Sequence, residues 1–183
     1  TGQPCASPLG QRALDQLAAR IFGKSAPQLL VLRDSSIAAL HLPGQIILLN
    51  RNLLEAQDGP ATAAGHILAE VARDRAIDPL LPLLSHAGLR ATFGLLTRGA
   101  LDAMAIAGYG EVILRAPPAP LPDAVLLAQF KAAGVASTAY AYSLDASGES
   151  VLGLIEADPY PAGPPQPLLS DGDWVSLQTI CAD

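Results

Sequence analysis

The residues best suited to chemistry in this chain are His66 and Glu70, which lie four positions apart in the run AAGHILAEVARD, residues 63–74. Positions i and i+4 share one face of a helix, so an imidazole and a carboxylate would be neighbours there. The run is half of the pattern H-E-x-x-H, in which two histidines bind zinc and the glutamate is the general base. It therefore has three interpretations: a working metal site, the remnant of one, or ordinary helix residues.

Three short apolar runs come before this predicted helix and are typical of strands: QLLVLRD, SIAALHL and QIILLN. Turn-forming residues separate them, Asp34-Ser35-Ser36 after the first run and Pro43-Gly44 after the second. The simplest arrangement is a meander, in which each strand pairs with the one that follows it. We therefore expect a small three-stranded sheet next to the helix that carries His66.

The rest of the chain predicts helices joined by proline-rich loops. Ser7 and Pro8 mark a helix start and Gly23 its end, and a later helix runs through DAVLLAQFKAAG to Gly134. Residues 80–110 are rich in Leu, Ala and Gly and predict helix in several pieces. With no internal repeat, residues 1–183 are expected to form a single α+β domain.

Composition and apolar run lengths argue against two functions, nucleic-acid binding and spanning a membrane. The formal net charge is −6 and the 11 basic residues are scattered, which excludes nucleic-acid binding, because phosphates require clustered Lys and Arg. No uncharged apolar run reaches the roughly 18–20 residues that span a bilayer. We therefore expect no transmembrane segment in this chain, while association with a membrane stays open.

Cys5 and Cys181 lie near opposite ends of the sequence, and neither belongs to a metal-binding or redox motif such as C-x-x-C. Domain termini are often close in space, so this spacing favours a disulfide that joins the two ends. Two free, buried thiols are the alternative. A disulfide would indicate an oxidising compartment, which predicts a periplasmic or otherwise exported protein.

Three motifs in order resemble those of the HtpX-like membrane-associated zinc metallopeptidases. The strand before the zinc helix in that family reads P-G-G-x-I-x-V-x-x-G-L-L, and residues 43–54 here read PGQIILLNRNLL. The zinc helix of the family reads A-A-x-x-A-H-E-x-x-H, and residues 61–70 here read ATAAGHILAE. Leu121-Pro122-Asp123 stands where the family has E-A-D, eleven residues before a glycine turn at Gly134.

The resemblance implies a zincin-like α+β fold, a small three-stranded sheet packed with several helices, in which most of the catalytic residues have been replaced. His66 matches the first zinc ligand, Ile67 the catalytic Glu, Glu70 the second His and Leu121 the ligand Glu. Isoleucine cannot accept a proton and leucine has no lone pair, whereas a catalytic zinc needs three protein ligands and a base. The expectation is a catalytically inactive pseudo-peptidase without a cofactor.

The remaining role of such a protein would be binding. In the family an extended substrate pairs with the edge strand above the zinc helix, and the matching strand here is the third apolar run. A peptide or protein partner could add a strand there without a metal. The resemblance thus predicts a cell-envelope protein that binds a partner on the strand formed by Gln45, Ile46, Ile47, Leu48, Leu49 and Asn50.

Two alternatives remain open from the sequence. The first is an active zinc metalloendopeptidase with a rearranged site, in which Asp123 joins His66 and Glu70 as the third ligand. The second is an assembly domain, whose Leu-rich segment 80–110 packs on a membrane protein or on a second subunit.

Overall fold

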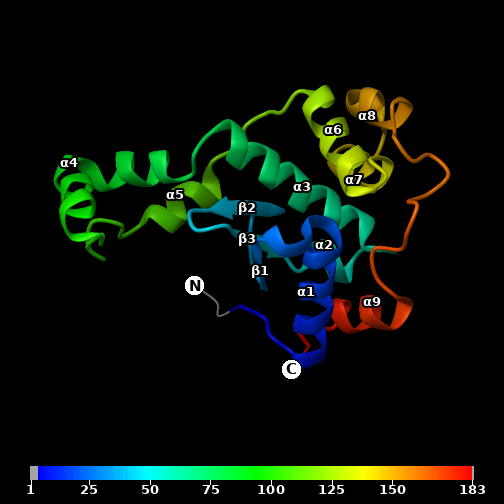
Figure 1. Ribbon diagram of the computed structural model, residues 1–183, viewed down its shortest axis with the longest axis horizontal. Coiled ribbons are helices and arrows are strands. Elements are labelled where there is room, and N and C mark those ends of the chain that lie inside the picture. The colour runs from blue at the N-terminus through cyan, green and yellow to red at the C-terminus, as the bar shows by residue number, and fades with distance from the viewer. Residues whose placement is uncertain (1–3, 183) are drawn as a thin grey trace.

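The structure, a computed structural model, describes residues 4–182 and combines helices with one small sheet (Figure 1). This confirms the mixed α and β character predicted from the sequence. The described elements are α1 (Pro8–Phe22), η1 (Gly23–Ser25), β1 (Gln28–Leu32), β2 (Ala39–Leu42), β3 (Ile46–Asn50), α2 (Asn52–Glu55), α3 (Ala61–Ala76), α4 (Leu80–Arg98), α5 (Tyr109–Arg115), α6 (Asp123–Ala133), α7 (Thr138–Leu144), η2 (Glu149–Val151), α8 (Leu152–Glu156) and α9 (Asp171–Gln178).

The sheet has the order β1-β3-β2, so the predicted meander is wrong. Strand β3 pairs in parallel with β1 and antiparallel with β2. After β1 the chain forms β2 one strand position away, and β3 then pairs between the two. Strand β3 is therefore central, and the expectation that residues 45–50 form an exposed edge is corrected. Its uninterrupted apolar run, IILL, suits a strand with a neighbour on both sides, because such strands are covered more completely than edge strands.

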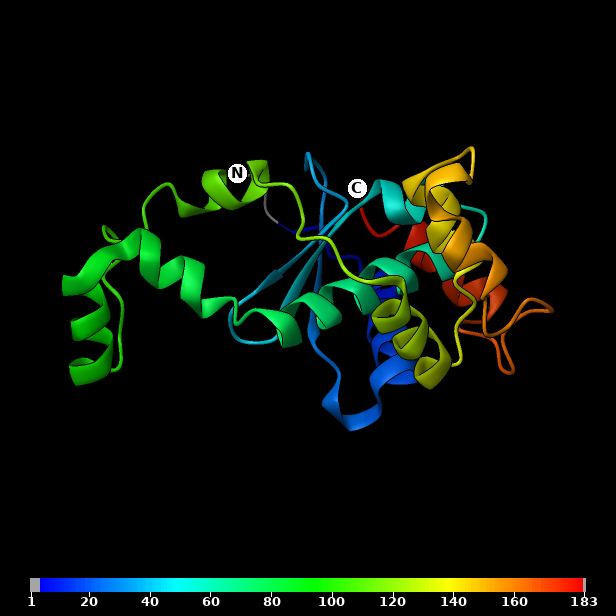
Figure 2. The same cartoon turned by 90° about the horizontal axis from the view of Figure 1, so that it is seen from above.

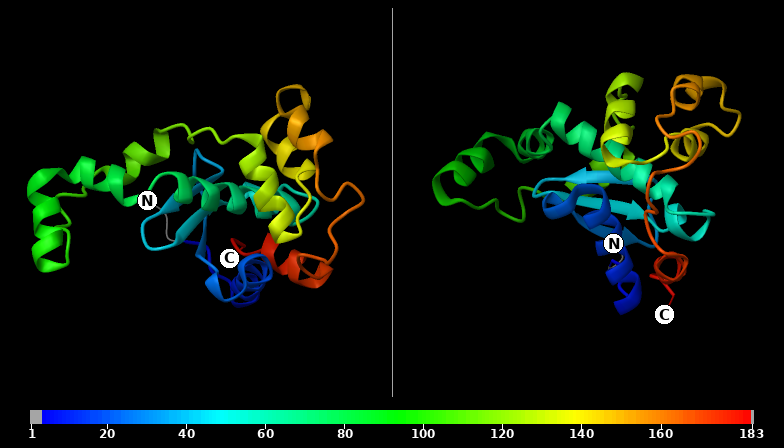
Figure 3. Two further views of the ribbon diagram at one scale, coloured as in Figure 1. Left: turned by 45° about the horizontal axis from the view of Figure 1, so that its top comes forward. Right: turned by 45° about the vertical axis from the view of Figure 1, so that its right-hand side comes forward.

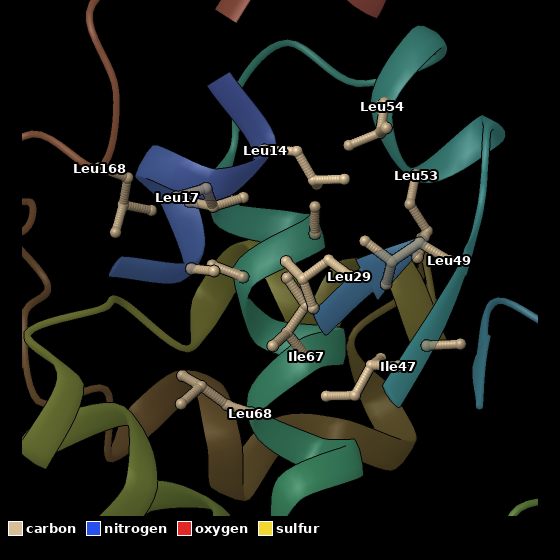
Figure 4. Close-up of a cluster of buried hydrophobic side chains, with 14 of the residues drawn as sticks. Leu14, Leu17, Leu29, Ile47, Leu49, Leu53, Leu54, Ile67, Leu68 and Leu168 are labelled. Atoms are coloured by element: carbon tan, nitrogen blue, oxygen red, sulfur yellow. The ribbon is translucent and has the colours of Figure 1, made fainter. Parts of the chain in front are cut away.

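Helix α3 is enclosed by the rest of the molecule. It packs against β2 and β3 on one side and against α6 and α7 on the other. Figure 4 shows Ile67 of α3 pointing into the same apolar cluster as Leu29 of β1 and Ile47 of β3, all of which are buried. Because layers cover both sides of α3, small residues fill much of it, and Ala63, Ala64 and Ala69 are fully buried.

The closest approach to α3 occurs at Gly65. A Cβ atom added to Gly65 would lie 2.4 Å from the Cβ atom of Tyr140, which belongs to α7. Real Cβ atoms do not come so close, so glycine is required for the two helices to meet at this distance. The contact places α7 directly beside His66, the next residue of α3.

Segments near the two ends of the chain come together beside β1, where the Cys5 N–H donates to the Val31 carbonyl. Helix α1 packs along α9, and a disulfide joins Cys5 to Cys181 with a Cα–Cα distance of 4.8 Å. The predicted disulfide is therefore present in the structure. The predicted caps of α1 are also confirmed: the Ser7 hydroxyl accepts a hydrogen bond from the Gly10 N–H, and Gly23 ends the helix with a positive φ of 60°.

Residues 80–116, which we call the arm, leave the remainder of the described chain, which we call the body, along α4 (Figures 1 and 2). Helix α5 returns beside the sheet, where the Ser36 hydroxyl donates to the Leu114 carbonyl at 2.9 Å. The two further views of Figure 3 show the same projection of α4. Neither α4 nor α5 shares an extensive packed interface with another described helix or strand. Helix α4 is broken at Gly88, whose φ of 82° is not helical. The expectation of helical pieces in this region is confirmed, and the pieces lie outside the core.

The disulfide gives a first prediction. It closes a loop with a sequence separation of 176 residues, so it restricts the unfolded chain strongly. In the chain-entropy description, replacing both cysteines (Cys5→Ser with Cys181→Ser) should lower the free energy of unfolding by up to about 5 kcal/mol. Urea denaturation of the wild type and the double variant measures the difference. The wild type unfolded in the presence of reductant should match the variant, and a variant as stable as the oxidised wild type would contradict the prediction.

Candidate functional site

The candidate site is the polar face of α3, where His66 meets helix α7. The Nε2 atom of His66 lies 3.0 Å from the hydroxyl of Ser143, and that hydroxyl donates to the Tyr140 carbonyl at 2.6 Å. Since the hydroxyl has one proton and gives it to the carbonyl, it accepts from His66, which fixes the imidazole proton on Nε2. The ring also lies edge-on to Tyr140, with centroids 4.9 Å apart.

The environment keeps the His66 imidazole neutral. Burial, followed by the positive charge of Arg73, lowers the pKa of His66 from 6.5 to about 4. A neutral imidazole with its proton on Nε2 donates to Ser143 and does not take a proton from it. The pair thus lacks the polarity of a serine nucleophile with its base, in which the histidine accepts the serine proton.

The buried carboxylate of Glu70 accepts hydrogen bonds from two groups. Its Oε2 atom accepts the backbone N–H of His41 at 3.0 Å, and its Oε1 atom accepts from Nη1 of Arg73. Arg73 in turn donates from Nε to the carbonyl of Ala119 at 2.9 Å, in the proline-rich connection before α6. Burial raises the pKa of Glu70 above its ordinary value, and Arg73 and the His41 N–H oppose that rise. The carboxylate therefore links three segments of the chain.

The positions carried over from the resemblance do not meet at His66. Ile67 is fully buried and faces the sheet in the apolar cluster of Figure 4, so it points away from Ser143. Leu121 is half-buried against the apolar core. Asp123 lies at the exposed start of α6, and its Oδ2 atom lies against Gly153 of α8.

The rearranged zinc site of His66, Glu70 and Asp123 is not assembled. Among residues 4–182, no three His, Cys, Asp or Glu side chains are grouped so that they could hold a metal ion. The reason is local: Glu70 faces Arg73 and β2, whereas Asp123 is exposed beside α8. The structure therefore supplies no ligand set for this alternative.

The backbone of the strand predicted to bind a peptide is also already paired on both sides. Strand β3 has both edges paired, so Gln45 and Ile46 to Asn50 cannot accept another strand. The outer edge of β1 is bridged by Cys5, whose N–H donates to the Val31 carbonyl at 2.8 Å. At the outer edge of β2 the N–H of His41 points away from β3 and is taken by Glu70. A peptide pairing there would have to displace the buried carboxylate.

Sequence reasoning missed the surroundings of His41. This side chain is 7% exposed, and neither of its ring nitrogens has a hydrogen-bond partner within the described residues. Its Nε2 atom lies 3.5 Å from Oδ1 of Asp74, close enough for an ion pair when the ring is protonated. The two residues line a cavity of about 490 Å³ with Gln45, Arg75 and Gln129. Nothing local marks this grouping, because it forms only when β2 meets α3.

Comparisons with known proteins add no assignment: no protein-family model matches the chain, and no curated protein matches it either. The site is therefore interpreted from its own geometry.

The buried carboxylate gives a second prediction. Glu70→Ala should lower the free energy of unfolding by about 3 kcal/mol or more, because Arg73 and the His41 N–H lose their buried acceptor. Glu55→Ala is the matched control, since Glu55 pairs with Arg51 and both side chains are more than a third exposed. That change should cost no more than about 1 kcal/mol. Urea denaturation measures both, and equal losses would contradict the role assigned to Glu70.

His66 gives a third prediction, on pH. Its pKa is about 4 in the folded protein and near 6.5 when unfolded, so unfolding takes up a proton between these values. The stability that His66 contributes is present above pH 6.5 and is lost as the pH falls toward 4, a change of about 3 kcal/mol in total.

His66→Gln should flatten this part of the pH profile, measured as the free energy of unfolding at successive pH values. Ser143→Ala removes the hydroxyl but keeps the imidazole, so it should retain the slope. A His66→Gln profile as steep as that of the wild type would show that another group causes the acid sensitivity.

Proposed function

We propose that this protein is a non-catalytic docking module of the cell envelope, with a rigid body that presents its apolar arm to a partner. The observation that carries the proposal is the exposure of the arm. Leu89, Phe93 and Leu96 are 91%, 68% and 79% exposed, although apolar side chains of this size are usually covered. The arm has no extensive packed interface with the body that could cover them.

The polar face of α3 supports the non-catalytic part of the proposal. His66 donates to Ser143, and the Glu70 carboxylate is occupied by Arg73 and by the backbone of β2. These contacts hold helices and strands in place, and the proton on Nε2 prevents His66 from acting as a base toward the Ser143 hydroxyl. An expected descent from HtpX-like peptidases agrees with the order of the motifs, and it stays a prediction here.

The disulfide supports the location. A bond between Cys5 and Cys181 persists in an oxidising compartment and is rare in the cytosol. An exported body closed in this way would be well suited to act outside the cytoplasm. Among the described helices none is both long and apolar enough to cross a membrane.

A fractionation experiment tests the docking role and is the fourth prediction. In cells that produce the protein naturally, the wild type should sediment with the envelope fraction. The triple variant Leu89→Gln, Phe93→Gln and Leu96→Gln should move to the supernatant, because its arm no longer offers an apolar surface. Glutamine suits a helix, and the three sites are exposed, so the melting temperature should stay the same.

The matched control replaces three exposed apolar residues of the body, Leu9→Gln, Leu152→Gln and Val175→Gln, and should still sediment. A triple arm variant that sediments like the wild type would contradict docking through the arm. Purified protein incubated with unfolded casein and zinc should release no peptides. Cleavage that is lost in His66→Ala would overturn the non-catalytic assignment.

A further inference from the structure

The arm has one continuous apolar face, formed by Leu89, Phe93 and Leu96 in the second half of α4, which we call the docking face. The three residues lie at positions i, i+4 and i+7, so they project from one side of the helix. Half of the exposed large apolar side chains of the described chain belong to the arm, although it is about a fifth of the residues. Its other exposed members are Leu81, Met104, Ile106 and Val112.

The charge of the arm differs in sign from that of the body. Arg90, Arg98 and Arg115 outnumber Asp102 and Glu111, which gives the arm a net charge of +1, whereas the whole chain carries −6. The residues outside the arm therefore carry −7. Helix α4 itself has two arginines and no acidic residue. An apolar face on a basic helix, in an otherwise acidic protein, is complementary to a surface that is apolar inside and negative outside.

The shape of α4 suits lying on such a surface and excludes crossing it. The break at Gly88 divides the helix, and the second half has about ten residues, roughly 15 Å against the roughly 30 Å of a hydrocarbon core. Arg90 follows Leu89 directly, about a quarter turn from the docking face. With the docking face turned into the bilayer, the Arg90 guanidinium would reach the phosphates beside it.

The described body offers the docking face of a second copy one partly apolar hollow, the cavity of about 490 Å³, where Ile21, Phe22 and Val71 lie beside the polar side chains of His41, Asp74 and Arg75. The larger described cavity lies between body and arm and is lined mainly by polar and charged residues, among them Arg33, Asn50 and Arg51 of the body and Glu111 and Arg115 of the arm. Exposed apolar residues of the body are distributed over separate helices, such as Leu9 on α1, Val125 on α6 and Val175 on α9. An apolar stripe needs an apolar partner, and a bilayer supplies one without a shaped groove.

We infer that the arm binds the surface of a phospholipid bilayer that contains anionic lipids. Leu89, Phe93 and Leu96 insert at the level of the headgroups, while Arg90, beside the docking face, supplies attraction to the lipid phosphates. The inference rests on the proposed docking function and names its partner. The residues outside the arm, with their net charge of −7, are repelled by the same surface, so that the arm alone makes the attachment.

Vesicle flotation of the purified full chain, with its disulfide intact, tests the inference and is the fifth prediction. Vesicles of phosphatidylcholine with about a third phosphatidylglycerol should carry the wild type upward, and pure phosphatidylcholine should carry much less. The triple glutamine variant of the docking face should bind at least about a hundredfold more weakly, because three large apolar side chains no longer leave water. The triple glutamine variant of the body should bind like the wild type.

A second pair of variants isolates the charge. Arg90→Gln with Arg98→Gln should weaken binding to the anionic vesicles about fivefold or more, mainly through Arg90, because Arg98 lies on the side of the helix opposite the docking face. Arg12→Gln with Lys24→Gln changes the net charge equally on exposed positions of the body and should have a much smaller effect. Added salt should weaken wild-type binding and leave the arginine variant less affected.

The outcomes separate this inference from the docking role on which it rests. A wild type that binds neither kind of vesicle overturns the lipid assignment, even if the arm still causes sedimentation with the cell envelope. Sedimentation equilibrium that shows a dimer lost in the docking-face variant, without vesicle binding, would identify a second copy as the occupant and also overturn it. Equal binding to both kinds of vesicle would overturn the requirement for anionic lipid.

Discussion

The packing of helix α3 on both of its sides is the constraint on which the other features depend. One side meets the sheet and the other meets α6 and α7, so nearly every residue from Thr62 to Ala72 is buried. An enclosed helix can contain only small or apolar side chains, or polar side chains that find partners inside. The alanines satisfy the first condition, and His66 and Glu70 satisfy the second through Ser143, Arg73 and the backbone of β2.

The same packing explains why residues with catalytic potential act as structural links. A general base needs a free lone pair near a substrate, and a metal ligand needs neighbours that converge on one point. One oxygen of Glu70 accepts from the backbone of β2 and the other from Arg73. Arg73 also donates to the proline-rich connection. His66 is neutral, buried and oriented by α7. These contacts stabilise the domain at the place where chemistry would otherwise be expected.

The arm differs from α3 because it leaves large apolar side chains uncovered. Helices of the body bury their apolar sides in the common core, and the disulfide, whose two cysteines belong to that core, joins segments near the two ends of the chain. The second half of α4 has an apolar face of comparable character but meets no layer of the body (Figure 2). A fold with one enclosed helix and one uncovered helix divides its apolar surface between stability and contact with something outside the chain. That division is the physical basis for interpreting the protein as a docking module.

Local sequence signals determined the elements of this protein. Ser7, Pro8 and Gly23 set the bounds of α1, Gly134 ends α6, and three apolar runs became the three strands, because caps, turns and short-range patterns act over a few residues. The pairing of Cys5 with Cys181 was also predictable, since two cysteines leave one intramolecular choice. The exposed position of the segment after α3 was not predictable, because an apolar run has the same sequence pattern whether it lies in a core or on a surface.

Only the tertiary structure decided the order of the strands and the partners of the polar residues. The turn residues between the strands are compatible with a meander, yet β3 lies in the centre, and the equally apolar run of β1 lies at the edge, so the apolar runs do not decide the order. His66 meets Ser143 across 77 positions, and Glu70 meets the backbone of His41 across 29. Contacts between such distant positions depend on how whole elements pack, and Gly65, which brings α7 against α3, is where the sequence controls that packing most directly.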